Sequence, residues 1–261
     1  MSKREKDKDK ETMITPSNGF VVYPTYRMID GKAYVYLFGK LESGESFLII
    51  TSNRPYFYIK KKDQHKLEQY LEKKKSAREF AEMHITFEKV SLKNFSDEEV
   101  VKVFVTFPNQ VPPLREHLDQ LEIEYYEADI PFAQRFLIDN DIKGCGEITG
   151  EYKKGNFVDK IYEEPKVRGI SDYGAHLKVL SFDLETSMNA EKILSLAYVC
   201  GRTKEVFLHT PKHVQHVQKE YVTCFSEEKS LITAFLEKVK NLDPDVITGW
   251  NVVDFDLNVL R

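Results

Sequence analysis

Short apolar runs separated by turn residues fill the first sixty residues. The runs span residues 20–23, 33–38, 47–50 and 55–59. Pro24, Gly39 and the pair Ser52-Asn53 follow the first three runs. Runs rich in β-branched and aromatic residues at this spacing are typical of strands. We therefore predict four strands joined as an antiparallel meander.

Helical and strand patterns alternate after residue 60. Residues 63–83 are polar, with Leu67, Tyr70 and Leu71 at helical spacing, and predict a surface helix. Residues 101–107 read as a strand, and Pro112-Pro113 introduces a helix that ends near Leu121. Together they predict a mixed α+β amino-terminal domain over residues 17–141. The Gly-rich and charged stretch 142–175 predicts a hairpin and a linker.

The pattern changes again in residues 176–261, which we expect to form a second domain. Strands are predicted at 179–185, 193–200, 205–209 and 245–249. Ser226 is the expected N-cap of a helix whose apolar face consists of Leu231, Ile232, Phe235, Leu236 and Val239. Three strands, a helix and a strand form the opening order of a ribonuclease H-like fold. The predicted class is thus α/β, a mixed α+β domain followed by a partial ribonuclease H-like domain.

Composition narrows the class of protein. With 41% hydrophobic and 31% charged residues, the 261-residue chain fits a globular protein. A net charge of −4 argues against a basic protein that coats DNA, but not against part of a nucleic-acid enzyme. Residues 1–16 alternate charges and predict a disordered tail rather than a signal peptide. Three scattered cysteines and no long apolar segment predict a cytoplasmic, nucleoid-associated protein, or a nuclear one in a eukaryote.

Acidic residues follow two of the apolar runs in the second domain. Asp183 and Glu185 end one run and lie on the same face of a strand, because side chains alternate along it. Asp256 follows the last run. Neighbouring carboxylates repel each other unless a cation such as Mg²⁺ or Mn²⁺ binds between them. The arrangement predicts a two-metal site that cleaves phosphodiesters; solvated strand ends are the alternative.

Three segments resemble family B DNA polymerases. Residues 182–186, Phe-Asp-Leu-Glu-Thr, are similar to the first exonuclease motif of that family. Residues 249–256 are similar to the second, with Asn251, Phe255 and Asp256 at motif positions. Residues 126–138 resemble the segment that follows the amino-terminal domain. Residues 141–176 are similar to the bacterial DNA polymerase II branch, and residues 55–58 to the archaeal branch.

This resemblance implies a DNA polymerase with 3′→5′ proofreading, active in replication and repair. Asp183, Glu185 and Asp256 would be both the catalytic residues and the ligands of two Mg²⁺ or Mn²⁺ ions. Thr186, Asn251 and Phe255 would contact the DNA. The third exonuclease motif and the polymerase motifs would lie beyond Arg261, so the exonuclease domain would be incomplete. The implied partners are primer–template DNA with its single-stranded 3′ end, the remainder of the polymerase in cis or in trans, and a sliding clamp.

The archaeal branch of the family carries an amino-terminal pocket that captures template uracil. Pro55, Tyr56 and Arg135 occupy positions that resemble parts of it. Aromatic walls suit a flipped base, whereas an ordinary strand core also explains Tyr56. Two alternatives to a polymerase remain open for the chain: a free-standing 3′→5′ nuclease of the same fold, and a non-catalytic nucleic-acid-binding module, for which uracil sensing is one option.

Overall fold

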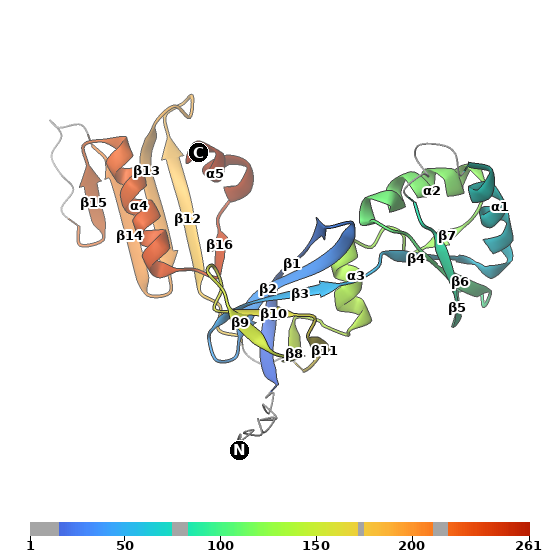
Figure 1. Ribbon diagram of the computed structural model, residues 1–261. Coiled ribbons are helices and arrows are strands. Elements are labelled where there is room, and N and C mark those ends of the chain that lie inside the picture. Colours follow the sequence, from blue (N-terminus) through green and yellow to red (C-terminus); the bar gives the residue numbers. More distant parts are fainter. Residues whose placement is uncertain (1–15, 75–82, 172–174, 211–218) are drawn as a thin grey trace, which may run out of the picture. The chain divides into compact units, whose positions relative to one another are not determined.

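The structure is a computed structural model that describes residues 16–74, 83–171, 175–210 and 219–261. Residues 1–15 of the predicted tail therefore lie outside the described residues. Contacts divide the chain into two units, Met1–Ala175 and His176–Arg261. The first unit contains two sheets and the second unit one (Figure 1). In the described part of the chain, no helix is long and apolar enough to cross a membrane.

The larger sheet of the first unit has seven strands in the order β11-β8-β1-β2-β3-β10-β9. Its strands are β1 (Ser17–Ile29), β2 (Lys32–Leu41), β3 (Ser46–Ser52), β8 (Cys145–Thr149), β9 (Tyr152–Lys154), β10 (Lys160–Glu163) and β11 (Lys166–Gly169). Helix α3 (Phe132–Asp139) packs Phe132 and Ala133 into the core of this sheet. In the stretch 142–175, β9 and β10 form the predicted antiparallel hairpin, whereas β11 lies where we predict a linker, and β8 and β11 also join the sheet. The strands of this stretch have three to five residues, too few to show a period.

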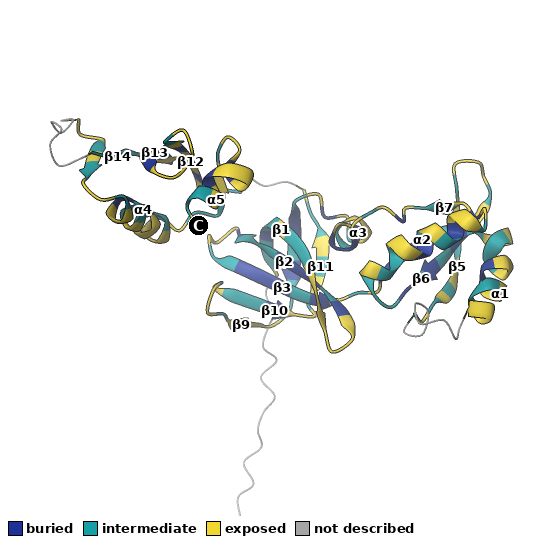
Figure 2. Ribbon diagram, turned by 90° about the horizontal axis from the view of Figure 1, so that it is seen from above, coloured by how far each residue is buried: buried dark blue, intermediate teal, exposed yellow. Residues whose placement is uncertain are grey.

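The smaller sheet of the first unit has the order β5-β6-β4-β7. Its strands are β4 (Tyr56–Lys60), β5 (Thr86–Lys93), β6 (Glu99–Phe104) and β7 (Tyr125–Tyr126). Helices α1 (Gln64–Lys74) and α2 (Val111–Gln120) contribute Leu67, Leu114 and Leu118 to its core. Figure 2 shows the exposed outer sides of both helices.

The predicted meander is wrong at its fourth strand. Strand β4 pairs with β6 and β7 rather than with β3. Between β3 and β4 the chain passes through Asn53, Arg54 and Pro55 and enters the other sheet. The apolar pattern of β4 indicates which side of the strand is buried, but it carries no information on the neighbouring strand.

The second unit is a five-stranded sheet in the order β15-β14-β13-β12-β16. Its strands are β12 (Val179–Thr186), β13 (Ile193–Cys200), β14 (Thr203–His209), β15 (Val222–Phe225) and β16 (Val246–Thr248). Helix α4 (Glu228–Leu242) packs Leu231 and Phe235 against the sheet. The partial ribonuclease H-like fold is confirmed, with β15 as a strand that the sequence did not reveal.

The start of α4 differs from the prediction by one residue. Glu227 is the N-cap instead of Ser226, and it forms no side-chain capping bond. The Glu228 carboxylate instead accepts a hydrogen bond from the Ile193 N–H at 2.7 Å. Leu236, predicted on the apolar face, is 55% exposed.

Candidate functional site

Strand β12 places two of the three predicted acids. Phe182 and Leu184 are buried in the core, while Asp183 and Glu185 are exposed. The predicted alternation is therefore confirmed. Strand β12 lies between β13 and β16, and its pairing with β13 continues to Thr186.

The third acid, Asp256, contacts β12 beyond the point where β16 stops pairing with that strand. Strand β16 pairs with β12 only as far as Thr248, which lies opposite Ser181. A buried backbone N–H beyond that point needs another acceptor. Asp256 supplies it, because its Oδ1 accepts a hydrogen bond from the Leu184 N–H at 3.1 Å. Asp256 is therefore hydrogen-bonded to the backbone of Leu184, the residue between Asp183 and Glu185.

The turn from β16 to Asp256 requires two special backbone positions. A Cβ on Gly249 would lie 2.3 Å from the Phe182 carbonyl oxygen, so only glycine fits there without a shift. Asn251 has φ 58, in the left-handed region that asparagine tolerates. A π-helical turn, Val252–Asp256, follows, and then the short α5 (Leu257–Val259). Asn251 thus acts through its backbone, since its side chain makes no capping bond.

The other predicted contact residues lie next to the acids. Thr186 is half-buried at the end of β12. Phe255 is 37% exposed, immediately before Asp256. Trp250 is 88% exposed in the preceding turn. The sheet end therefore combines carboxylates with accessible aromatic rings.

The acids fit a divalent cation chemically, although they do not form a closed cluster. Among the described residues, no group of three or more His, Cys, Asp or Glu side chains is arranged to hold a metal ion. The Oδ2 atom of Asp256 is buried and has no hydrogen-bond partner in that same part of the chain. A buried, unpaired carboxylate oxygen is costly. Such hard oxygen ligands are those that Mg²⁺ and Mn²⁺ prefer.

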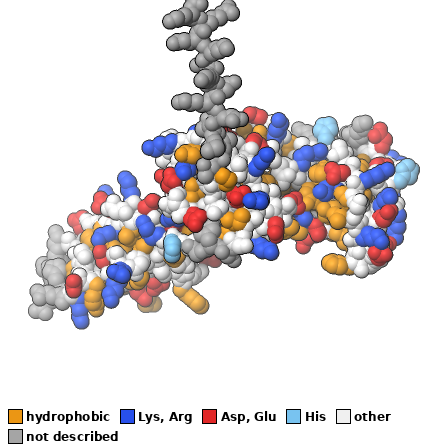
Figure 3. Space-filling view, turned by 90° about the horizontal axis from the view of Figure 1, so that it is seen from below, with side chains coloured by type: hydrophobic (Ala, Val, Ile, Leu, Met, Phe, Trp, Pro, Cys, Tyr) orange, Lys and Arg blue, Asp and Glu red, His pale blue; other side chains and the backbone are white. Residues whose placement is uncertain are grey.

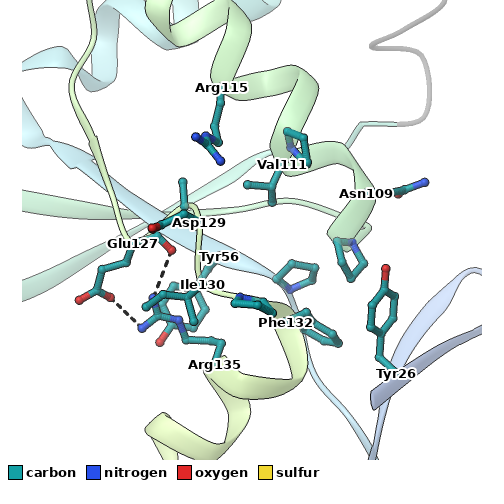
Figure 4. A pocket seen from close by; sticks show the side chains of 15 residues that line it. Tyr26, Tyr56, Asn109, Val111, Arg115, Glu127, Asp129, Ile130, Phe132 and Arg135 are labelled. Atoms are coloured by element: carbon teal, nitrogen blue, oxygen red, sulfur yellow. Dashed lines mark hydrogen bonds and ion pairs between the residues drawn. The ribbon is translucent and has the colours of Figure 1, made fainter. Parts of the chain in front are cut away.

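A second candidate site is a pocket of about 330 Å³ in the first unit. Its walls come from β1, the start of β4, α2, α3 and the two segments that precede these helices (Figure 4). We call it the base pocket. The residues that line it are Tyr26, Pro55, Tyr56, Pro108, Asn109, Val111, Pro112, Arg115, Glu127, Ala128, Asp129, Ile130, Pro131, Phe132 and Arg135.

The predicted residues Tyr56 and Arg135 contact each other in the base pocket. The Arg135 guanidinium lies 4.9 Å from the centre of the Tyr56 ring and forms an ion pair with Glu127 at 2.7 Å. The Tyr56 hydroxyl donates a 2.6 Å hydrogen bond to Asp139. Burial and this bond raise the pKa of Tyr56 well above its ordinary value, so the hydroxyl remains protonated. Arg135 is only 5% exposed, and its Nε has no partner among the described residues.

Sequence reasoning missed most of the base pocket. Tyr26 and Phe132 form an edge-to-face pair, with ring centres 5.5 Å apart, across more than a hundred residues of sequence. Arg115 reaches the pocket from α2. No periodicity links segments so far apart, and only the resemblance of Pro55, Tyr56 and Arg135 pointed to the pocket.

Comparisons with known proteins point to one family. Residues 123–261 match the family model described as "DNA polymerase family B, exonuclease domain". The chain is 31% identical over 245 residues to the DNA polymerase of Archaeoglobus fulgidus, a match that covers 93% of this chain and 30% of that protein. It is also 31% identical over 245 residues to the DNA polymerase of Thermococcus kodakarensis, covering 89% of this chain and 13% of that protein.

A solved structure gives the same result. The family B DNA polymerase of the hyperthermophilic archaeon Pyrobaculum calidifontis superimposes with a TM-score of 0.69 at 25% identity. The match covers 93% of this chain and 31% of that one. The chain thus spans less than a third of the length of these relatives.

Proposed function

The chain belongs to DNA polymerase family B, and we propose that it forms the amino-terminal portion of such a polymerase with part of its 3′→5′ proofreading site. One observation carries the proposal. The Asp256 carboxylate is bonded to the backbone of Leu184, between Asp183 and Glu185. This bond joins the two sequence motifs that the family resemblance singled out.

In this proposal Asp183, Glu185 and Asp256 hold Mg²⁺ or Mn²⁺. Such ions, when bound, would activate a water and stabilise the charge that develops on the scissile phosphate. The Leu184 N–H fixes the orientation of Asp256. The exposed Asp183 and Glu185 remain accessible to substrate.

Two further residues receive the single-stranded 3′ end in this proposal, and a third, Asn251, positions one of them. Phe255 presents an accessible ring beside Asp256, against which a base can stack. Thr186 directly follows Glu185 in β12 and offers a hydroxyl to the DNA. Asn251 shapes the turn that carries Phe255, because its O accepts the hydrogen bond from the Phe255 N–H at 3.0 Å.

A nuclease assay with Mn²⁺ on 5′-labelled single-stranded DNA tests this function. We expect no shortening by the chain alone. Shortening from the 3′ end should appear once a polypeptide with the remaining exonuclease segment of the family is added, and Asp183→Ala should abolish it while the exposed neighbour variant Asp254→Ala should not. Turnover by the chain alone, lost in Asp183→Ala, would instead identify a free-standing nuclease. No turnover by the chain alone or with the added polypeptide would identify a binding module.

The base pocket supports a second function, capture of a template base such as uracil. Its volume of about 330 Å³ lies in the range of small-ligand sites. Aromatic walls from Tyr26, Tyr56 and Phe132 suit the faces of a flipped base. Arg135, buried between Tyr56 and Glu127, has an Nε–H without a partner among the described residues, which can donate to a ligand.

Binding of oligonucleotides that carry one uracil or one thymine tests the base pocket. We expect tighter binding of the uracil strand. In Tyr26→Ala the ratio of the two affinities should fall about tenfold, since one stacked base contributes about 1–3 kcal/mol. Tyr23→Ala is the matched control, because Tyr23 is an exposed tyrosine on the same strand that does not line the pocket. Equal affinity for both strands would exclude uracil capture.

A further inference from the structure

The four-stranded sheet of the first unit has a second face, opposite α1 and α2. The helices pack on Phe57 and Ile59 of β4 and on Val101 and Val103 of β6. Because side chains alternate, the intervening residues of these strands point the other way. We call this side the aromatic face. It consists of Tyr56, Tyr58, Val100, Lys102, Phe104 and Tyr126.

Pairing register places the rings and a lysine of the aromatic face side by side. Tyr56 lies opposite Phe104, and Tyr58 lies opposite both Lys102 and Tyr126. The ring centres of Tyr56 and Tyr58 are 5.6 Å apart, as are those of Tyr56 and Phe104. Three aromatic rings therefore form a continuous patch across the two central strands.

Cations lie over these rings. The Lys102 Nζ is 4.1 Å from the centre of the Tyr56 ring, and the Arg54 guanidinium is 4.9 Å from that of Phe104. Within the described residues neither cation forms an ion pair with a carboxylate. On the side of the molecule drawn in Figure 3, hydrophobic and basic side chains lie next to one another over the part that carries β4 to β6.

A pocket of about 250 Å³ extends the aromatic face toward the tip of the β5–β6 hairpin. Tyr58, Val100 and Tyr126 line it from the sheet, and the hairpin contributes Leu92 and Phe95, among others. Leu92 is 51% exposed and Phe95 is fully exposed. Phe95 therefore gives the fold no buried surface, and its ring is accessible to a ligand.

The carboxylates around this pocket are largely neutralised. Glu98 pairs with Lys60 and Lys62 at 2.8 and 2.9 Å, and Glu124 pairs with Lys60 at 2.8 Å. Glu127 pairs with Arg135. Two acids near the face form no ion pair within the described part of the chain: Glu88 is opposite Lys102 in the β5–β6 register, and Asp139 accepts the hydrogen bond of the Tyr56 hydroxyl.

We propose that the aromatic face and the Phe95 tip bind single-stranded nucleic acid. Bases stack against Phe104, Tyr58 and Phe95, and the phosphates approach Lys102 and Arg54. Stacking rings and nearby cations are the two features with which proteins bind single strands without sequence preference. Phe95 is fully exposed, while Tyr58 and Phe104 are half-buried. An apolar peptide would use the rings and the pocket, but it would gain nothing from the two cations. This site is distinct from the carboxylate site and goes beyond the function proposed above.

Fluorescence anisotropy with labelled oligothymidylate and oligouridylate of about twelve nucleotides tests the proposal on the whole chain. Phe95→Ala should weaken binding of both strands about five- to tenfold, the lower part of the range for a stacked base. Lys102→Gln should also weaken both, because it removes a positive charge near the phosphates. Phe157→Ala is the matched control, because Phe157 is also fully exposed but lies outside the aromatic face. It should change the affinity less than twofold.

Two further variants separate this site from the others. Glu88→Gln should strengthen binding, because it removes the acid opposite Lys102. Tyr23→Ala, which removes an exposed ring of β1 outside both the base pocket and the aromatic face, should leave the oligothymidylate affinity unchanged. Unequal losses for the two strands would still support the site, because only oligouridylate carries the uracil that the base pocket is proposed to capture. Absence of binding, or wild-type affinity in both Phe95→Ala and Lys102→Gln, would overturn the proposal.

Discussion

Gly249 is the residue that allows the two acid motifs to meet. Its backbone approaches Phe182 so closely that a methyl group would clash with the carbonyl oxygen. We expect Gly249→Ala to lower the free energy of unfolding by about 1–3 kcal/mol, the usual cost of overpacking. Urea denaturation of the chain measures it.

Gly201→Ala is the matched control for this variant. Gly201 has φ +58, and a Cβ at this position would meet nothing within 4 Å, so its substitution tests backbone strain without a clash. We expect a cost of about 1 kcal/mol. A smaller loss in Gly249→Ala than in Gly201→Ala would contradict the close approach of the two segments.

Asp256 combines a structural hydrogen bond with a second carboxylate oxygen that has no partner within the described part of the chain. Asp256→Asn keeps an acceptor for the Leu184 N–H and should leave stability within about 1 kcal/mol. Asp256→Leu removes the acceptor and should cost about 1–3 kcal/mol, because a buried N–H is left without a partner. Thermal unfolding of both proteins measures the difference, with the exposed Asp254→Leu as control. Equal losses in the two Asp256 variants would show that the hydrogen bond contributes nothing.

At the scale of single residues, the sequence predicted the acids better than their environment. Alternation along one strand was enough to place Asp183 and Glu185 on the exposed face. The burial of Asp256 was not predictable, because it depends on where β16 stops pairing with β12. The same holds for Arg135, whose burial results from packing between Tyr56 and Glu127.

At the scale of elements, Glu98 connects the β5–β6 hairpin to the end of β4. It bonds Lys60, Lys62 and the Asn94 side chain, and these bonds lower the pKa of its carboxyl to about 2. A carboxyl with a lowered pKa in the folded state adds stability above its unfolded pKa of about 4.3. That contribution is lost as the pH falls toward 2.

The pH dependence of unfolding tests this connection. We expect Glu98→Gln to be less stable than the wild type at pH 7, and the difference to disappear as the pH falls from about 4.3 toward 2. Melting temperatures of both proteins across this range are the measurement. Glu88→Gln, on the neighbouring strand, is the control. A difference that stays constant with pH would show that Glu98 acts by packing rather than by charge.

The strand and helix predictions failed where assignment depended on distant partners. All four early runs form strands, yet β4 belongs to a different sheet from β1–β3. The sequence did not show that residues 142–169 join the large sheet, because the strands there are short and two of them pair with distant strands, β8 with β1 and β10 with β3. Local patterns predict which residues form a strand, whereas the choice of sheet is decided by packing.

At the scale of the whole molecule, the candidate sites lie on separate units. The base pocket and the aromatic face belong to the first unit, and the carboxylates belong to the second. Each unit has its own hydrophobic core. A variant that disturbs packing in one unit is therefore expected to act on that unit's own core.

The central claim is that Asp183, Glu185 and Asp256 act together on a divalent cation. Titration of the chain with Mn²⁺, followed by calorimetry, tests this claim most directly. We expect binding that is lost or weakened at least about tenfold in both Asp183→Asn and Asp256→Asn and retained in Asp254→Asn, because each ligand adds a charged oxygen. No Mn²⁺ binding by the wild-type chain, or binding that both variants retain, would contradict the claim.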